Sequence, residues 1–231
     1  MPESLYDFHA RVDEFQQDSL PHAGDLVTRA SLTDKVAPDG SLRPFHGSTV
    51  IYGLTDAEKL ALAHRQTLLH HLCAPCLAEP LEPASFHLTL HDLISGTNLP
   101  DVSARVARTI RQAEDLLQAI RQENTPPVQV VSTHAFSMVN TSVVMGFAPQ
   151  TEADCERLMV LYERFHAVVP LQWGLTPHVT LAYYRPGCYG QETLHALQEA
   201  IRRMEDLPPL QLTLHPERLF CRRFSDMNHY F

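Results

Sequence analysis

The stretch PASFHLTLHDL, residues 83–93, places a histidine, a threonine and a second histidine at alternate positions. Its central tetrapeptide His-Leu-Thr-Leu (87–90) nearly recurs as His-Val-Thr-Leu (178–181), within TPHVTLAYY (176–184). With 14 His, 16 Thr and 31 Leu among 231 residues, a random order would give about 0.13 copies of His-x-Thr-Leu. Two copies therefore indicate a repeated unit.

The order of elements around the two tetrapeptides also repeats. The β-branched run STVIYGL (48–54) precedes the first, and TSVVMGF (141–147) precedes the second; both are typical of strands. The two runs are offset by 93 residues (141 − 48), and the two histidines by 91 (178 − 87). This agreement predicts a duplicated unit and two similar lobes, with the tetrapeptide strands opposed across a cleft.

A helix is predicted after each of these first strands. Thr55 and Glu58 form a capping box at the start of one helix, and Thr151 is a cap for the other. The apolar face of the first helix is expected to comprise Leu60, Leu62, Leu68, Leu69 and Leu72. Further helices are predicted over 102–123 and 191–207, each followed by a strand, beginning at Val128 and Leu210. The alternation fits either α/β lobes or antiparallel sheets that contain hairpins.

Composition and the N-terminal segment restrict the class of protein. Residues 1–47 are rich in turn signals and are predicted to be an N-terminal extension to one domain over 48–231. No apolar run is long enough for a membrane span, and no secretory signal begins the sequence, so a cytoplasmic location is expected. Five scattered cysteines fit reduced thiols. The net charge of −9 favours a small nucleotide or an oligonucleotide terminus as partner over long nucleic acid.

The repeated tetrapeptide carries side chains suited to chemistry at phosphorus. On a strand, side chains at i and i+2 share a face about 6.8 Å apart, so His87 points with Thr89, and His178 with Thr180. Two imidazoles across a cleft can remove a proton from a nucleophile and protonate a leaving oxygen, and histidine suits either role near neutral pH. The threonine hydroxyls can donate to phosphate oxygens. This arrangement requires no metal and no other cofactor.

Three further features have more than one interpretation. Strand alternation also places His91 and Tyr184 on the catalytic face, where Tyr184 could stack on a base or bind phosphate, or could instead pack at the end of its strand. His91 has either a substrate-binding or a structural role. HHLCAPC (70–76) has short His and Cys spacings that can bind zinc, but a second pair at matching spacing is missing.

The sequence resembles the two-histidine (2H) phosphoesterase superfamily. The resemblance rests on HLTL and HVTL, on Pro177 and on the duplicated strand-helix-strand order over 45–231. That superfamily includes the RNA 2',3'-cyclic phosphodiesterases. The resemblance implies an α+β fold in which two sheet-plus-helix lobes surround a central cleft. The segment before Ser48 is similar to a bacterial subgroup of 2H-like proteins that carries an N-terminal extension.

The same resemblance implies a phosphoric diester hydrolase that cleaves a cyclic phosphate or processes an RNA end without a metal. His87 and His178 would be the acid/base pair, and Thr89 and Thr180 would bind the phosphate. Two interpretations from other classes remain: a non-catalytic nucleotide-binding or sensing module that uses the same cleft, and a zinc-dependent hydrolase that uses residues 70–76.

Overall fold

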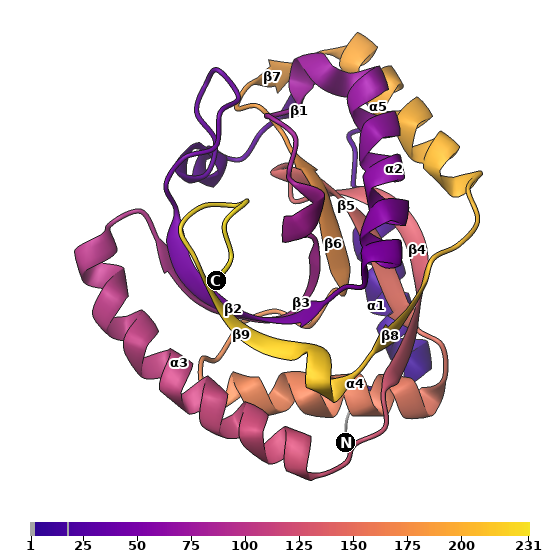
Figure 1. Ribbon diagram of the computed structural model, residues 1–231. Helices are drawn as coiled ribbons and strands as arrows, with labels where there is room; N and C mark the ends of the chain where they lie inside the picture. The colour runs from indigo at the N-terminus through magenta and orange to yellow at the C-terminus, as the bar shows by residue number, and fades with distance from the viewer. Residues whose placement is uncertain (1–2, 18) are drawn as a thin grey trace.

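Two antiparallel sheets form the frame of the protein (Figure 1). The computed structural model describes residues 3–17 and 19–231, without the side chains of residues 99 and 101. The first sheet has the order β3-β2-β9 and comprises β3 (His87–Gly96), β2 (His46–Gly53) and β9 (Leu219–Phe224). The second has the order β6-β5-β4-β8 and comprises β6 (His178–Tyr183), β5 (Ser142–Pro149), β4 (Val128–Met138) and β8 (Gln211–Leu214). The predicted α+β fold with two sheet-plus-helix lobes is confirmed, and its sheets are of the antiparallel kind.

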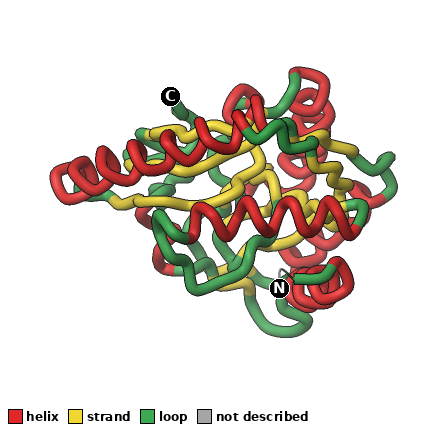
Figure 2. Tube along the Cα trace, turned by 90° about the horizontal axis from the view of Figure 1, so that it is seen from below, coloured by secondary structure: helices red, strands yellow, loops and turns green. Residues whose placement is uncertain are grey.

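Helices cover the outer faces of both sheets. Figure 1 shows α3 along the three-stranded sheet and α2 with α5 over the four-stranded sheet. The helix α4 packs against strands of both sheets and against α3, and Figure 2 shows these two helices crossing the near face when the molecule is seen from below. The helices are α1 (Leu5–Gln17), α2 (Asp56–Cys73), α3 (Leu99–Gln122), α4 (Glu152–His166) and α5 (Gln191–Glu205).

The two sequence halves exchange elements between the lobes. The strand β4 follows the first half of the chain but pairs with β5 of the second sheet. The strand β9 follows the second half but pairs with β2 of the first sheet. In the same way, α2 belongs to the first half and packs on α5 and β6. The lobes therefore interlock, and each one needs residues from both halves to complete its sheet.

The helix ends and faces follow local sequence closely. Thr55 and Glu58 form the predicted capping box, and the Thr151 hydroxyl accepts a hydrogen bond from the Asp154 N–H. Leu62 is fully buried on α2, whereas Leu60 is 73% exposed, so its predicted place on the apolar face was wrong. At about 100° per residue, two positions rotate Leu60 to nearly the opposite side of the helix. No helix in the described ranges is long and apolar enough to cross a membrane.

The N-terminal segment packs into the body of the protein. The helix α1 contacts α4 and β4, and β1 (Leu26–Val27) pairs with β7 (Cys188–Tyr189). Six buried apolar side chains of this segment join the main core: Phe8, Val12, Leu26, Leu32, Val36 and Phe45. A Cβ at Gly146 of β5 would lie 2.7 Å from Nε2 of Gln16, so glycine permits the close approach of α1. Gly146 pairs with His178 of β6, so the N-terminal segment lies close to the strand that carries His178.

Candidate active site

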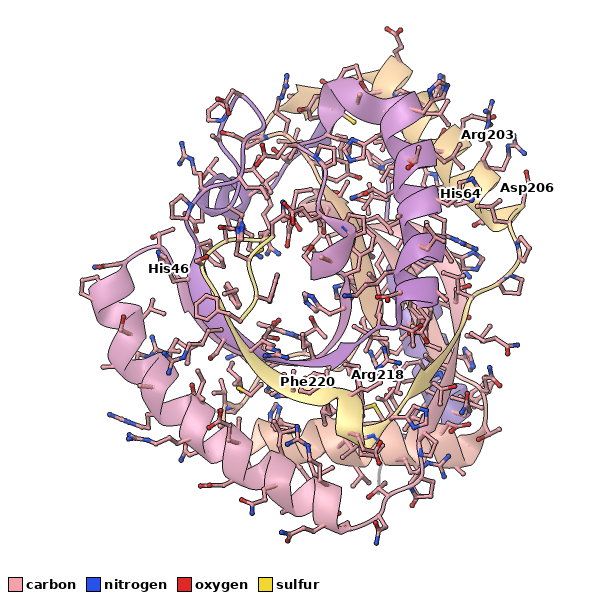
Figure 3. The ribbon with its side chains drawn as sticks, in the orientation of Figure 1. His46, His64, Arg203, Asp206, Arg218 and Phe220 are labelled. Atoms are coloured by element: carbon pink, nitrogen blue, oxygen red, sulfur yellow. The ribbon has the colours of Figure 1, made fainter. Side chains whose placement is uncertain are left out.

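The structure brings the two tetrapeptides together across a cleft between the sheets. His87 and Thr89 on β3 and His178 and Thr180 on β6 line one hollow of about 310 Å³. A second hollow of about 750 Å³ shares Thr89, His178 and Thr180 with the first, so the two hollows adjoin at these side chains. In Figure 3, side chains from both sheets point into the space between them, whereas labelled His64 and Arg203 lie on the outer helices α2 and α5.

The two histidines are held in the same way. Nδ1 of His87 lies 2.7 Å from the Ser85 carbonyl oxygen, and Nδ1 of His178 lies 2.7 Å from the Thr176 carbonyl oxygen. A carbonyl oxygen can only accept, so each Nδ1 must carry a proton and donate it. The proton at Nδ1 leaves Nε2 of each neutral ring with a lone pair. Both imidazoles are therefore set in the tautomer that can accept a proton at Nε2.

Burial favours the neutral form of both histidines. It lowers the pKa of His87 to about 4; the hydrogen bond to Ser85 opposes this shift, and nearby His178 adds to it. Burial also lowers the pKa of His178, against the hydrogen bond to Thr176 and the negative charge of Asp92. A bound phosphate anion would raise the pKa of both rings, because an opposite charge nearby favours the protonated form.

A β-bulge lies at the last residue of each tetrapeptide. On β3, residues 89 and 91 pair with neighbouring residues 51 and 50 of β2, so Leu90 is an extra residue. On β6, residues 180 and 182 pair with neighbouring residues 144 and 143 of β5, so Leu181 is extra. Each bulge reverses the alternation of side chains beyond it. The next residues to face the cleft are consequently Asp92 and Tyr183, and both line the two hollows.

The bulges explain why Tyr184 and His91 pack in the interior, the structural alternative that the sequence left open for both. Tyr184 is fully buried and lines neither hollow; the cleft position belongs to its neighbour Tyr183. His91 is 1% exposed, and its ring lies 5.0 Å from the Tyr162 ring on α4, although it borders the larger hollow. Its Nδ1–H donates to the Asp92 carbonyl oxygen at 2.7 Å. His91 is thus a buried packing group beside the site, on the other side of the strand from His87.

The segment 224–231 closes one side of the cleft. The ring of Tyr230 lies 4.5 Å from the ring of His87, and the Tyr183 hydroxyl donates to Sδ of Met227 at 3.0 Å. Oδ1 of Asn228 accepts from the N–H of Glu82 and lies 3.4 Å from Oγ of Ser85, whose carbonyl holds His87. This segment supports the histidine and its carbonyl partner together. Nothing in its local sequence pointed to the site.

The threonine hydroxyls are placed as free donors at the cleft. Thr89 and Thr180 are half-buried and border both hollows. Within residues 3–17 and 19–231, neither hydroxyl has a protein hydrogen-bond partner, so each is available to a ligand. A hydroxyl on each side of the cleft fits the two non-bridging oxygens of a phosphodiester.

Both cysteines of the short His and Cys run at 70–76 lie in the core. Burial raises the pKa of Cys73 to about 12 and that of Cys76 to about 11, and the Cys76 thiol donates to the Cys73 carbonyl oxygen. His71 on the same run is exposed. In the described part of the chain there is no group of three or more His, Cys, Asp or Glu side chains arranged to hold a metal ion.

Comparisons with known proteins support the fold. The chain is similar in structure to the conserved protein of unknown function ATU0111 from Agrobacterium tumefaciens, with a TM-score of 0.60 and 17% identity over 95% of this chain and 96% of that chain. It also matches apo LigT from E. coli (TM-score 0.46, 12% identity, 82% and 95% covered) and a phosphoesterase (TM-score 0.42, 14% identity, 81% and 94% covered). No family model and no curated protein matches the sequence.

Proposed function

We propose that this protein is a metal-independent phosphodiesterase that cleaves a cyclic phosphate or a phosphodiester in a small nucleotide or at an oligonucleotide end. One observation carries the proposal: two histidines on opposite strands each donate from Nδ1 to a carbonyl oxygen two residues earlier and line one hollow with two unpaired threonine hydroxyls. RNA ends with a terminal cyclic phosphate are one source of such substrates.

The reaction needs one neutral and one protonated imidazole. The oxygen of water or of a 2'-hydroxyl attacks phosphorus, and its proton passes to Nε2 of the neutral ring. The bond from phosphorus to the leaving oxygen breaks, and that oxygen takes the proton from Nε2 of the other ring. Thr89 and Thr180 donate hydrogen bonds to the non-bridging oxygens as negative charge develops on them. Proton transfer on both sides is supplied by side chains, so the chemistry needs no metal-bound water.

The test is turnover of nucleoside 2',3'-cyclic phosphates and 2'-5'-linked oligonucleotides by the wild-type protein and by His87→Ala and His178→Ala. Each substitution should lower kcat by about 10²–10⁴-fold, with far-ultraviolet circular dichroism unchanged and with EDTA having no effect on the wild-type rate. His64→Ala, on the outer side of α2, is the matched control and should keep full activity (Figure 3). Full activity in both cleft variants would refute the assignment.

A second candidate function rests on the lowered pKa of both histidines, which disfavours the protonated ring that the cleavage step needs as its acid. On this alternative the protein binds or senses a nucleotide without cleaving it. Measurable binding of cyclic phosphates together with no turnover between pH 5 and 8 would favour the alternative.

A further inference from the structure

Lys35, in the N-terminal segment, borders both hollows of the cleft. It follows the short helix η1 (Ala30–Asp34), its N–H donates to the Leu32 carbonyl oxygen, and its own carbonyl accepts from the N–H of Arg43. The backbone of Lys35 is therefore fixed on both sides. Among the lysines and arginines of the described residues, it is the one that borders both hollows, together with Thr180 and His178.

The Lys35 ammonium is held by aromatic rings, with its hydrogen-bond donors unused. Nζ lies 5.1 Å from the centre of the Phe45 ring and 5.5 Å from the centre of the Tyr183 ring. Across the described ranges, 3–17 and 19–231, no carboxylate pairs with Nζ and no hydrogen bond from it is found. Ring faces attract a cation but leave its three N–H donors without acceptors. The position favours an anion from outside the protein.

A neighbouring cation shows the contrast. Arg11 also borders the larger hollow, but its guanidinium forms hydrogen bonds with both carboxylate oxygens of Glu3, at 2.7 and 2.8 Å, and with the Leu175 carbonyl oxygen at 3.0 Å. The positive charge of Arg11 is thereby compensated by the carboxylate of Glu3. Asp92 borders the same hollows as Lys35 and would repel an incoming anion, so binding of a phosphate there requires a compensating positive charge.

We propose that Lys35 binds a non-bridging oxygen of the substrate phosphate beside His178 and Thr180, which makes residues 30–45 part of the active site. This inference rests on the proposed phosphodiesterase function. The cleavage step places a second negative charge on the phosphoryl oxygens, and an ammonium among aromatic walls stabilises that charge more strongly than it would in water. Lys35 therefore selects anionic phosphodiesters over uncharged phosphate triesters.

The experiment measures binding of inorganic phosphate by isothermal titration calorimetry, and turnover of a nucleoside 2',3'-cyclic phosphate, for Lys35→Met, Lys35→Arg and Arg108→Met. Arg108 is exposed on α3 and lines neither hollow, so its replacement removes the same charge away from the cleft. Lys35→Met should weaken phosphate binding by about 10–100-fold and lower kcat/KM by a similar factor. Lys35→Arg should restore most of both, and Arg108→Met should behave as the wild type. Circular dichroism and the Tm of each variant check that the fold is kept.

The outcomes separate the two proposals. If the wild type cleaves the substrate and Lys35→Met binds phosphate as Arg108→Met does, Lys35 has no role and the phosphodiesterase assignment stands. If the wild type binds phosphate through Lys35 but cleaves no phosphodiester, the anion site stands and the assignment fails. No phosphate binding by the wild type would overturn the Lys35 site directly.

Discussion

The lowered pKa of His87 predicts a measurable loss of stability in acid, which His87→Gln should relieve. The pKa falls from its ordinary value of 6.5 to about 4 on folding, chiefly because the ring is buried. Below pH 6.5 the unfolded chain binds a proton at His87 that the folded protein does not bind. The contribution to stability is therefore complete above pH 6.5 and is lost as pH falls from 6.5 to about 4.

The size of this effect follows from linkage. At pH 4.5 the two pKa values give a loss of about 2.5 kcal/mol relative to neutral pH. Because the ring keeps some contact with solvent, we expect about 1–2 kcal/mol. Glutamine keeps a polar side chain of similar length and cannot gain the proton. The measured quantity is the change in unfolding free energy between pH 7.5 and 4.5, compared between the wild type and His87→Gln, because the other buried histidines then cancel.

Urea denaturation followed by tryptophan fluorescence gives these free energies. His64→Gln is the matched control, since the exposed His64 side chain on α2 is in water in both states, and its pH-dependent difference from the wild type should be close to zero. An equal acid-induced loss in the wild type and in His87→Gln would show that His87 is not buried as a neutral ring, and the reasoning about the cleft would be wrong.

Two further predictions concern the residues that the bulges place in the cleft. Asp92→Asn removes a negative charge that raises the pKa of both His87 and His178, so the pH at which kcat/KM is highest should become more acid. The control Asp115→Asn, on the exposed face of α3, should leave that pH unchanged. An unchanged pH maximum in Asp92→Asn would contradict the electrostatic role of Asp92. Tyr184→Ala should lower the unfolding free energy by about 3–5 kcal/mol without changing KM, whereas Tyr183→Ala should raise KM; the reverse pattern in steady-state kinetics would refute the observed register.

The two bulges are features of the site that the sequence pattern did not predict. A period of two along a strand assumes an uninterrupted ladder of hydrogen bonds, and within that assumption His91 and Tyr184 share a face with the two His-Thr pairs. Leu90 and Leu181 are extra residues only when their strands are aligned with the partner strands β2 and β5. The sequence predicts that β2 and β5 are strands, but the register between paired strands depends on tertiary packing.

Other parts of the site come from distant segments. Lys35 and Tyr230 lie near the two ends of the sequence and carry no repeated pattern, yet both line the hollow that contains His87 and His178. The duplicated order of strands and helices also does not predict that β4 and β9 are exchanged between the sheets. That order indicates which segments form strands, but it does not indicate which sheet edge each strand joins.

The sequence by itself determined the two His-x-Thr-Leu strands, their apolar anchors, the helix caps and the existence of two related lobes, because these depend on alternation and hydrogen bonds between near neighbours. Only the tertiary structure decided which side chains beyond each threonine face the cleft, which lobe each outer strand completes, and which distant residues surround the histidines. Those choices depend on pairing register and burial between segments far apart in the chain, and no local pattern of residues encodes them.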